Sequence, residues 1–222
     1  MWFQKYNFMK ITIIYDNTVF KDGLQPDWGF SALVEAGGKK ILFDTGGRGS
    51  ILRANMSRLG IVPKEIDDVF ISHAHFDHVG GLSDFLDQNG NVTVWCPPSF
   101  RGVKGVKEVV AIDKPRKLYN GIFSTGELGG IEQSLCIATP KGIVIVAGCS
   151  HPSMASMEQA AAGFGRVYGI VGGLHGNQPS TLKNFKFICA THCTQYKQEI
   201  SSLYSPYFIE GGAGKTIEIQ AA

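Results

Sequence analysis

All six histidines of this chain stand where they could bind a metal ion. Three of them fall in one short run, residues 73–78 with the sequence HAHFDH, which also contains an aspartate. The other three, His151, His175 and His192, each follow a short apolar stretch that is typical of a buried strand. Imidazole is the commonest nitrogen ligand for zinc and similar ions. The distribution therefore predicts a protein built around a metal site.

The spacing within residues 73–78 suits two ions that share one backbone segment. Because alternate residues of extended backbone point to the same side, His73 and His75 can bind one ion together. Asp77 and His78 fall at the following turn, where they could bind a second ion. Two-metal hydrolytic sites have this arrangement, with the ions about 3.5–4 Å apart. A solvent-exposed polar loop would explain a single histidine, but it does not explain this combination.

His151 and His192 are predicted to complete the site. His151 follows the apolar run 142–147 and a glycine-bearing loop, and His192 follows the apolar residues 187–190. Ligands at the ends of core strands are held rigidly, as a preorganised metal site requires. Taken alone, each would more often be a satisfied core or loop histidine. Together with the histidine cluster, both are predicted to be ligands.

The composition limits the classes of protein to which the chain could belong. Its 222 residues are 44% apolar and 18% charged, which is typical of a globular protein long enough for one domain. A net charge of +2 provides no broad attraction to nucleic acid or anionic lipid. No stretch of about 18 apolar residues is present, so no membrane span is expected. Together, the small net charge and the lack of such a stretch predict neither a nucleic-acid nor a membrane partner. We expect a small-molecule substrate, and the sequence leaves open whether the chain is a homo-oligomer.

The cysteines and the first residues indicate a cytoplasmic protein. The five cysteines are an odd number without CxxC spacing, which fits reduced thiols better than a disulfide framework. Most are expected to be small buried apolar residues, but Cys149 and Cys193 lie beside two of the histidines and could touch the site. Residues 1–8 lack the pattern of a signal peptide. They are expected to be a short N-terminal extension that precedes a single domain over residues 9–222.

Short apolar and β-branched runs recur along the chain and predict strands. They cover residues 11–15, 31–34, 40–43, 68–72, 91–95, 135–138, 142–147, 167–171, 185–189 and 216–219. Helices are expected over residues 50–59, with Ser50 as the N-cap, and over residues 82–86, 154–164 and 195–203. Two sheets covered by outer helices would accommodate both the strand-rich first part and the later strand–helix alternation.

The motifs resemble those of the metallo-β-lactamase superfamily. Asp44 in the sequence FDTG, the run 73–78, His151 in GCSHP and His192 follow one another in the order of that superfamily. The resemblance covers nearly the whole chain from Met9. It implies an α/β (α+β) fold, a four-layer αβ/βα sandwich in which two mixed β-sheets carry helices on their outer faces. A binuclear metal site would lie at one edge.

Further segments resemble one branch of that superfamily, related to the dihydropterin–ribofuranosylaminobenzene phosphate synthase of methanopterin biosynthesis. They include residues 15–17 (YDN), 132–135 (EQSL) and 148–152 (GCSHP). Residues 172–175 (GGLH) and 191–194 (THCT) agree with that branch too. These motifs are more specific for ancestry than for activity.

The resemblance also implies which residues hold the ions. The first set would be His73, His75 and His151, and the second would be Asp77, His78 and His192. Asp44 would support the ligands from behind by accepting the second N–H of an imidazole. The alternative role of Asp44 is that of a turn residue before the glycines that follow it.

The chain departs from the superfamily at one position. Many members place an aspartate that bridges both ions on the strand end that corresponds to residues 171–173, where this chain has no acid. The second site could therefore be weaker, half filled or bridged only by hydroxide. His175 is expected to face the substrate or support the ligands, with a ligand or a plain loop residue as alternatives. Trp28 could form an aromatic lid over the metal edge or pack in the core or at the rim.

We expect a metal-dependent hydrolase that acts on a small, phosphorylated molecule through metal-bound hydroxide. Asp77 would be the catalytic residue that also orients this hydroxide. One or two divalent ions are expected, with zinc first and iron or manganese as alternatives. Two other functions stay open: a transferase that joins a dihydropterin methyl diphosphate to an aromatic amine, and a non-catalytic zinc-binding module. Structural zinc is usually closed by four protein ligands rich in cysteine, whereas the expected site leaves an open position. This difference argues against the module.

Overall fold

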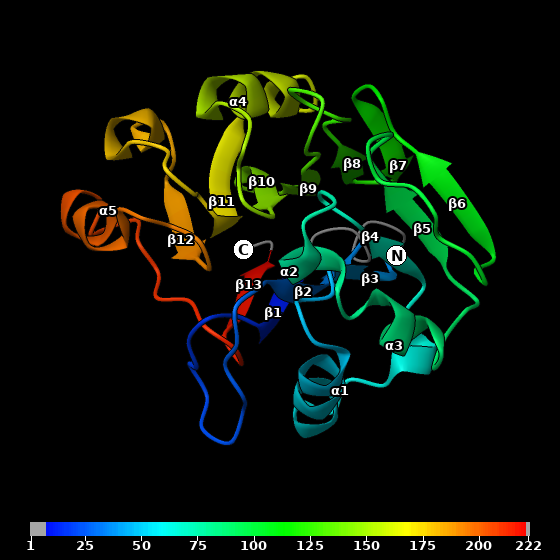
Figure 1. Cartoon of the computed structure of the whole chain (residues 1–222). Helices are drawn as coiled ribbons and strands as arrows, with labels where there is room; N and C mark the ends of the chain where they lie inside the picture. Colours follow the sequence, from blue (N-terminus) through cyan, green and yellow to red (C-terminus); the bar gives the residue numbers. More distant parts are fainter. Residues whose placement is uncertain (1–7, 221–222) are drawn as a thin grey trace.

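In a computed structural model of the protein, residues 8–220 are described, and they form two packed β-sheets (Figure 1). The strands of the first sheet are β1 (Phe8–Tyr15), β2 (Ser31–Ala36), β3 (Lys39–Phe43), β4 (Asp68–Phe70), β5 (Thr93–Cys96), β6 (Glu108–Ala111) and β13 (Thr216–Gln220). Those of the second are β7 (Arg116–Tyr119), β8 (Ile122–Ser124), β9 (Leu135–Thr139), β10 (Gly142–Ala147), β11 (Val167–Gly173) and β12 (Phe187–Thr191). The helices are α1 (Gly49–Arg58), α2 (Phe76–Val79), α3 (Leu82–Leu86), α4 (Met154–Ala162) and α5 (Lys197–Leu203), with 3-10 turns at Pro63–Glu65 and Pro179–Leu182.

Both sheets are mixed. The first has the order β13-β1-β2-β3-β4-β5-β6, in which β3 to β6 are parallel and the remaining pairs are antiparallel. The second has the order β12-β11-β10-β9-β8-β7, in which β10, β11 and β12 are parallel. Because parallel strands end on the same side, each sheet gathers several loops at one edge.

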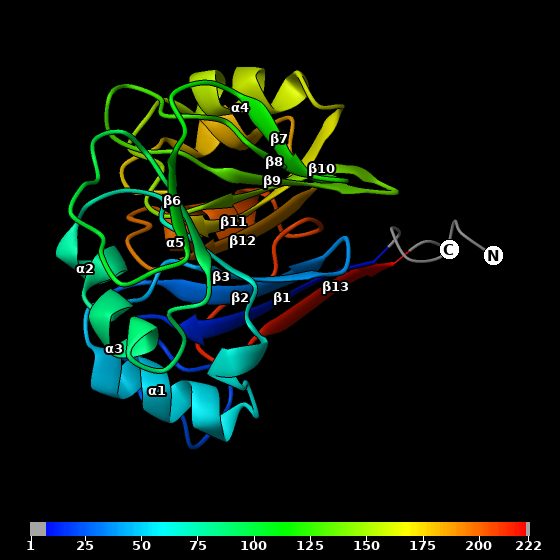
Figure 2. The same ribbon diagram turned by 90° about the vertical axis from the view of Figure 1, so that its right-hand side faces the viewer.

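The side chains of the strands fill three apolar layers. In β10, Val144 and Val146 face the other sheet, whereas Ile143 and Ile145 pack outward under α4. A strand that is buried on both faces has a continuous apolar sequence, as this one does. Figure 2 shows α4 on the outer side of the second sheet and α1 and α3 on the outer side of the first. The αβ/βα sandwich is therefore present as predicted.

The structure corrects several expected details. Every predicted strand overlaps an observed one, but β6, β7 and β8 were not predicted from the sequence. β6 and β7 are exposed edge strands, so they lack the apolar pattern of buried strands. The Ser50 cap is wrong, because α1 begins at Gly49 and has no side-chain cap. Of the expected extension, only Phe8 lies within the described residues, and it begins β1.

Within residues 8–220, no helix combines the length and the apolar character needed to cross a bilayer.

Candidate metal centre

The candidate residues lie in loops that leave the carboxyl ends of strands in both sheets. Asp44 follows β3, and residues 73–78 follow β4 and include α2. In the second sheet His151 follows β10, and His192 follows β12. Figure 2 places α2 at the left-hand end of the sandwich, where these loops meet. Such loops are held by a rigid scaffold and are common sites of binding and catalysis.

The first group of candidate ligands contains three histidines. The ring centroids of His73, His75 and His151 lie 4.6–4.9 Å from one another. His73 Nε2 lies 3.1 Å from His75 Nδ1. Two nitrogens bound to one zinc ion at tetrahedral angles are about 3.3 Å apart, given zinc–nitrogen bonds of about 2.0–2.1 Å. The three rings therefore have the spacing of ligands to one ion.

The second group contains Asp77, His78 and His192. Asp77 Oδ2 lies 3.2 Å from His192 Nε2 and 3.8 Å from His78 Nε2. The ring of His78 is also 4.2 Å, centroid to centroid, from the ring of His73 in the first group. The six residues that were predicted as ligands thus form two adjoining groups.

Asp44 lies behind the second group. Its Oδ2 is 2.8 Å from His78 Nδ1 and accepts a hydrogen bond from the Ser72 hydroxyl at 2.6 Å, while Oδ1 accepts one from the Ser72 backbone N–H at 2.7 Å. Asp44, Ser72 and His78 are all fully buried. Burial acts to lower the pKa of His78, but the Asp44 carboxylate outweighs it and raises that pKa. This contact leaves Nε2 as the atom that His78 directs toward the site.

Asn17 and Asp16 orient His192. Asn17 Oδ1 lies 3.0 Å from His192 Nδ1, and the Asn17 amide donates to the His192 carbonyl at 3.0 Å. The His192 backbone N–H donates to Asp16 Oδ1 at 3.2 Å. Sequence reasoning missed both roles, although Asp16 and Asn17 belong to the YDN segment that carries the resemblance.

Glu132 organises the loop that carries His151. Its carboxylate accepts hydrogen bonds of 2.9–3.1 Å from the four consecutive backbone N–H groups of residues 148–151. The next residue, Gln133, donates from its side chain to the Ile71 carbonyl at 2.9 Å. Residues 132 and 133 therefore tie the loop after β10 to the loop after β4. The EQSL segment indicated ancestry, but nothing in the sequence pointed to this role.

Strained backbone is concentrated around these loops. Within residues 8–220, the non-glycine residues with positive φ are Asp44 (51°), Ser150 (58°), His175 (43°) and His192 (48°). Such conformations cost about 1–3 kcal/mol each and persist only where the surroundings impose them. All four residues are in loops at the same edge, which is the pattern expected of a functional site.

The protonation of the histidines fits metal binding. Burial lowers the pKa of His73 and of His192, and it lowers the pKa of His151 to about 4. These rings are therefore neutral at pH 7 and have a free lone pair. Among the described residues, the buried Nε2 atom of His151 has no hydrogen-bond partner, and the Nε2 atom of His192 has only the Asp77 carboxylate, 3.2 Å away. A cation would supply the missing partner to His151 and would bind His192 and Asp77 together.

The carboxylate of the second group is ionised. Burial acts to raise the pKa of Asp77, but the neighbouring rings of His192 and His78 outweigh it and hold that pKa below its ordinary value. One group thus offers three imidazoles, and the other offers two imidazoles and a carboxylate. Zinc, iron and manganese all accept such ligands.

His175 and two aromatic residues surround the groups. The ring of His175 is 4.9 Å from that of His151, and both line a cavity that also includes Asn177. Trp28 lies 5.2 Å from His192, ring centroid to centroid, and is 53% exposed. Phe76, beside Asp77, is 69% exposed. Trp28 therefore lies at the rim of the site and not in the core.

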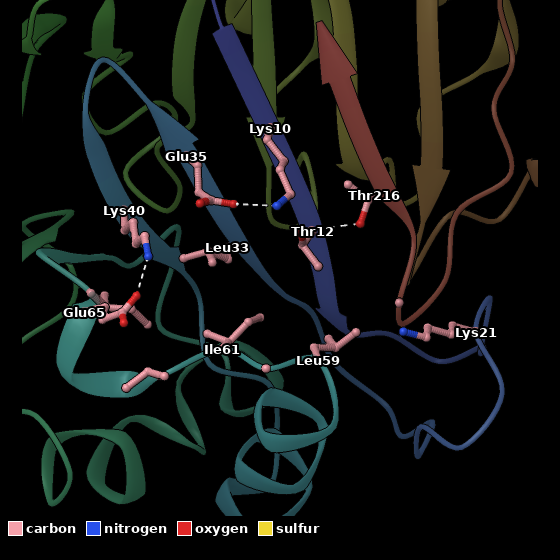
Figure 3. A pocket seen from close by; sticks show the side chains of 14 residues that line it. Lys10, Thr12, Lys21, Leu33, Glu35, Lys40, Leu59, Ile61, Glu65 and Thr216 are labelled. Atoms are coloured by element: carbon pink, nitrogen blue, oxygen red, sulfur yellow. Dashed lines mark hydrogen bonds and ion pairs between the residues drawn. The ribbon is translucent and has the colours of Figure 1, made fainter. Parts of the chain in front are cut away.

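A separate hollow lies away from these groups, on the outer face of the first sheet (Figure 3). Lys10 and Lys40 line it, but each is paired with a carboxylate, Glu35 and Glu65 respectively. None of its lining residues was predicted to bind a metal.

Comparison with known proteins identifies the family. Residues 26–118 match the family model described as the metallo-beta-lactamase superfamily. A protein of Methanocaldococcus jannaschii, named 7,8-dihydropterin-6-methyl-4-(beta-D-ribofuranosyl)-aminobenzene-5'-phosphate synthase, is 32% identical in an alignment that covers 75% of this chain and 80% of that protein. The chain belongs to the metallo-β-lactamase superfamily.

Solved structures of the superfamily have the same fold. A metal-dependent hydrolase of the β-lactamase superfamily matches with a TM-score of 0.77 at 22% identity and covers 96% of this chain and 100% of that one. A diphosphatase from the PhnP family matches with a TM-score of 0.65 at 17% identity and covers 97% and 98%. The family and the sandwich fold predicted from the sequence are thus confirmed. The metallo-β-lactamase superfamily generally binds divalent metals, and this chain has grouped side chains that could hold them.

Proposed function

We propose that the protein is a metal-dependent hydrolase that acts on a small, phosphorylated molecule. The observation that carries the proposal is the convergence of His73, His75, His151 and of Asp77, His78, His192 into two adjoining groups. The Nε2 atom of His151, which has no hydrogen-bond partner among the described residues, and the Nε2 atom of His192, 3.2 Å from Asp77 Oδ2, lie within these groups. Two groups that share the segment 73–78 fit two ions, as in two-metal hydrolytic sites.

When bound, the ions would supply Lewis-acid chemistry, which activates water and polarises a phosphoryl oxygen. The protein's own residues hold the ions and fix the geometry. Asp77 is the proposed catalytic residue, because its ionised carboxylate can accept a hydrogen bond from the attacking water as well as bind the second ion. Asp44 and Asn17 position the rings of His78 and His192.

The rim indicates a substrate with an aromatic part. Trp28 and Phe76 expose most of their surface beside the second group. Gly47 separates them: a Cβ there would lie 3.0 Å from the Trp28 carbonyl oxygen and 3.5 Å from Phe76 Cε2. A planar ring stacked on these side chains would hold an attached phosphate over the two groups. His175 would contact the substrate from the opposite side, in the cavity next to His151.

A second candidate function is the transfer of the dihydropterin methyl group of a dihydropterin methyl diphosphate to an aromatic amine, with release of diphosphate. The Methanocaldococcus jannaschii relative, which is named as the synthase of a 7,8-dihydropterin-6-methyl aminobenzene phosphate, favours it, since it matches this chain over most of both lengths. The same residues would serve, because the departing diphosphate would lie where a hydrolysed phosphate lies. The reactions differ in the atom that is attacked: water would attack phosphorus and break a P–O bond, whereas the amine would attack the methyl carbon and break its C–O bond to the diphosphate.

Metal analysis and turnover test the proposal together. Protein purified without added metal should contain about two ions of zinc, iron or manganese per chain and should hydrolyse a generic phosphodiester or diphosphate. The His73→Ala and Asp77→Ala variants should lose both metal and activity, whereas Asp22→Ala, at an exposed carboxylate, should keep both. Loss of metal with activity retained would overturn the mechanism.

Substrate panels separate the functions. Release of phosphate or diphosphate that depends on an added aromatic amine would favour the transferase, and release without it would favour the hydrolase. One tightly held zinc ion with no turnover of any phosphorylated, lactone or pterin substrate would contradict both and leave a non-catalytic zinc module.

A further inference from the structure

Cys149 lies between the two candidate groups of ligands. Its Sγ is within 4.8 Å of ligand atoms of His73 and His151 in the first group, and within the same distance of ligand atoms of His78 and His192 in the second. One of these atoms, His78 Nε2, is 3.1 Å away. Asp44 also forms a compact set with one member of each group, His73 and His78, but Cys149 does so with two members of each.

We propose that the Cys149 thiolate is a ligand shared by both metal ions, in place of the bridging carboxylate that this chain lacks. The proposal rests on the metal site of the proposed function and goes beyond it by adding a sulfur ligand. It answers the question that the sequence left open, namely what joins two sites when no acid follows β11.

The end of β11 explains why the shared ligand comes from another strand. A Cβ at Gly173, where a side chain would begin, would lie 2.5 Å from the Gly148 carbonyl oxygen and 2.7 Å from Cys193 Sγ. These distances leave no room for a carboxylate side chain at that position. The loop after β10 fills the space instead, and it carries Cys149.

The backbone around Cys149 is built to fix the sulfur. The Cys149 N–H donates to Glu132 Oε1 at 3.0 Å, and the N–H groups on either side bind the same oxygen. Gly148 allows the loop to approach closely, because a Cβ there would clash with the Ser72 hydroxyl and lie 3.1 Å from His73 Nδ1. Cys149 is 3% exposed, so its sulfur is aimed at the groups and not at solvent.

Independent support for a ligand at this point comes from the histidines on both sides. The Nε2 atom of His151 is buried and has no hydrogen-bond partner among the described residues, and the buried Nε2 atom of His192 has only the Asp77 carboxylate at 3.2 Å. The side chain of His192 is fully buried. A thiol has one weak donor, so Cys149 alone cannot satisfy both rings. An ion on each side of the sulfur would satisfy the two nitrogens and the thiolate together.

A shared thiolate has a consequence for the choice of metal. Sulfur ligands favour zinc and iron over magnesium or calcium, and hydroxide or carboxylate bridges do not impose this preference. A zinc–sulfur bond of about 2.3 Å is longer than a zinc–nitrogen bond of about 2.0–2.1 Å. A sulfur that lies between the two groups can therefore bind an ion in each of them.

Cobalt(II) substitution tests the proposal without relying on activity. Metal-free protein is titrated with cobalt(II) while two absorptions are recorded, the visible ligand-field bands and the near-ultraviolet thiolate-to-cobalt charge-transfer band. In the wild type the charge-transfer band should rise with the first equivalent and again with the second, and X-ray absorption at the cobalt edge should show a sulfur neighbour for every cobalt. In Cys149→Ser the band should be absent while ligand-field bands persist.

Cys193→Ser is the matched control, because Cys193 Sγ is the other sulfur near these loops and lies 3.9 Å from the Cys149 carbonyl oxygen. It should keep the charge-transfer band. Circular dichroism of both variants checks that they fold, and Cys149→Ala provides a second substitution if the serine variant does not. A band that saturates at one equivalent, survives in Cys149→Ser or disappears in Cys193→Ser would overturn the proposal. Ligand-field bands without a charge-transfer band in the wild type would overturn it and leave the metal site intact, whereas no cobalt binding would overturn both.

Discussion

Asp44 Oδ2 lies 2.8 Å from His78 Nδ1, and neither side chain is exposed to solvent. The same carboxylate binds both the hydroxyl and the backbone N–H of Ser72, which directly precedes the first histidine of the cluster. One residue of the loop after β3 therefore fixes the direction of a ring in α2 and the start of the histidine loop. Partners of this kind set the tautomer of a ligating imidazole and raise its basicity.

We predict that Asp44→Asn weakens metal binding by about 10–100-fold, because the amide cannot accept hydrogen bonds from both Ser72 and His78 as the carboxylate does. The affinity is measured by competition with a chromophoric chelator. Asp22→Asn, an exposed carboxylate in a loop, is the control and should bind metal like the wild type. Unchanged affinity in Asp44→Asn would show that Asp44 is only a turn residue.

Glu132→Gln should destabilise the metal-free protein by about 3 kcal/mol, because hydrogen bonds to a buried charge contribute about 1.5–3 kcal/mol each and the amide presents a donor to at least one backbone N–H. Urea unfolding in the presence of a chelator measures this loss. Glu218→Gln, on the exposed side of β13, should change the free energy of unfolding by less than about 0.5 kcal/mol. Equal stabilities of the two variants would contradict the role of Glu132 in holding residues 148–151.

Asp16 should make stability depend on pH. Burial raises the pKa of Asp16 from 3.8 to about 6, although its hydrogen bond from the His192 N–H acts to lower it. Between these pH values the folded state binds more protons than the unfolded state, so stability falls as pH rises through this range. The difference corresponds to about 3 kcal/mol.

The Asp16→Asn variant removes this titration and keeps an oxygen for the His192 N–H. Relative to the variant, the metal-free wild type should lose up to about 3 kcal/mol between pH 4 and pH 6, measured by urea unfolding with a chelator present. Asp113→Asn, at an exposed carboxylate, corrects for the removal of a charge and should show no such trend. A constant difference between the wild type and Asp16→Asn across this range would refute the buried, protonated Asp16.

The sequence predicted the parts of this molecule that follow local rules. Buried strands such as β10 have a continuous apolar run, and the spacing of residues 73–78 indicated two groups of ligands. Edge strands β6 and β7 escaped prediction, because exposed strands carry no such pattern. Glu132 escaped assignment, and Cys149 was expected only to touch the site, for another reason: their contacts depend on loops that are far apart in sequence and that meet only in the folded chain.

The exposed aromatic rim gives the last prediction, which depends on the proposed function. Trp28→Ala and Phe76→Ala should each raise KM about 3- to 10-fold for a phosphodiester with an aromatic group and leave kcat nearly unchanged, because stacking contributes about 0.5–1.5 kcal/mol to binding and does not touch the reacting atoms. A methyl phosphodiester should show no such change. Phe20→Ala is the control, since Phe20 is 50% exposed but packs against Lys215, whose ammonium lies 4.2 Å from its ring. Equal KM values for all three variants on the aromatic substrate would remove the rim from the substrate site, whereas a selective rise in the two rim variants would place the aromatic part of the substrate between Trp28 and Phe76.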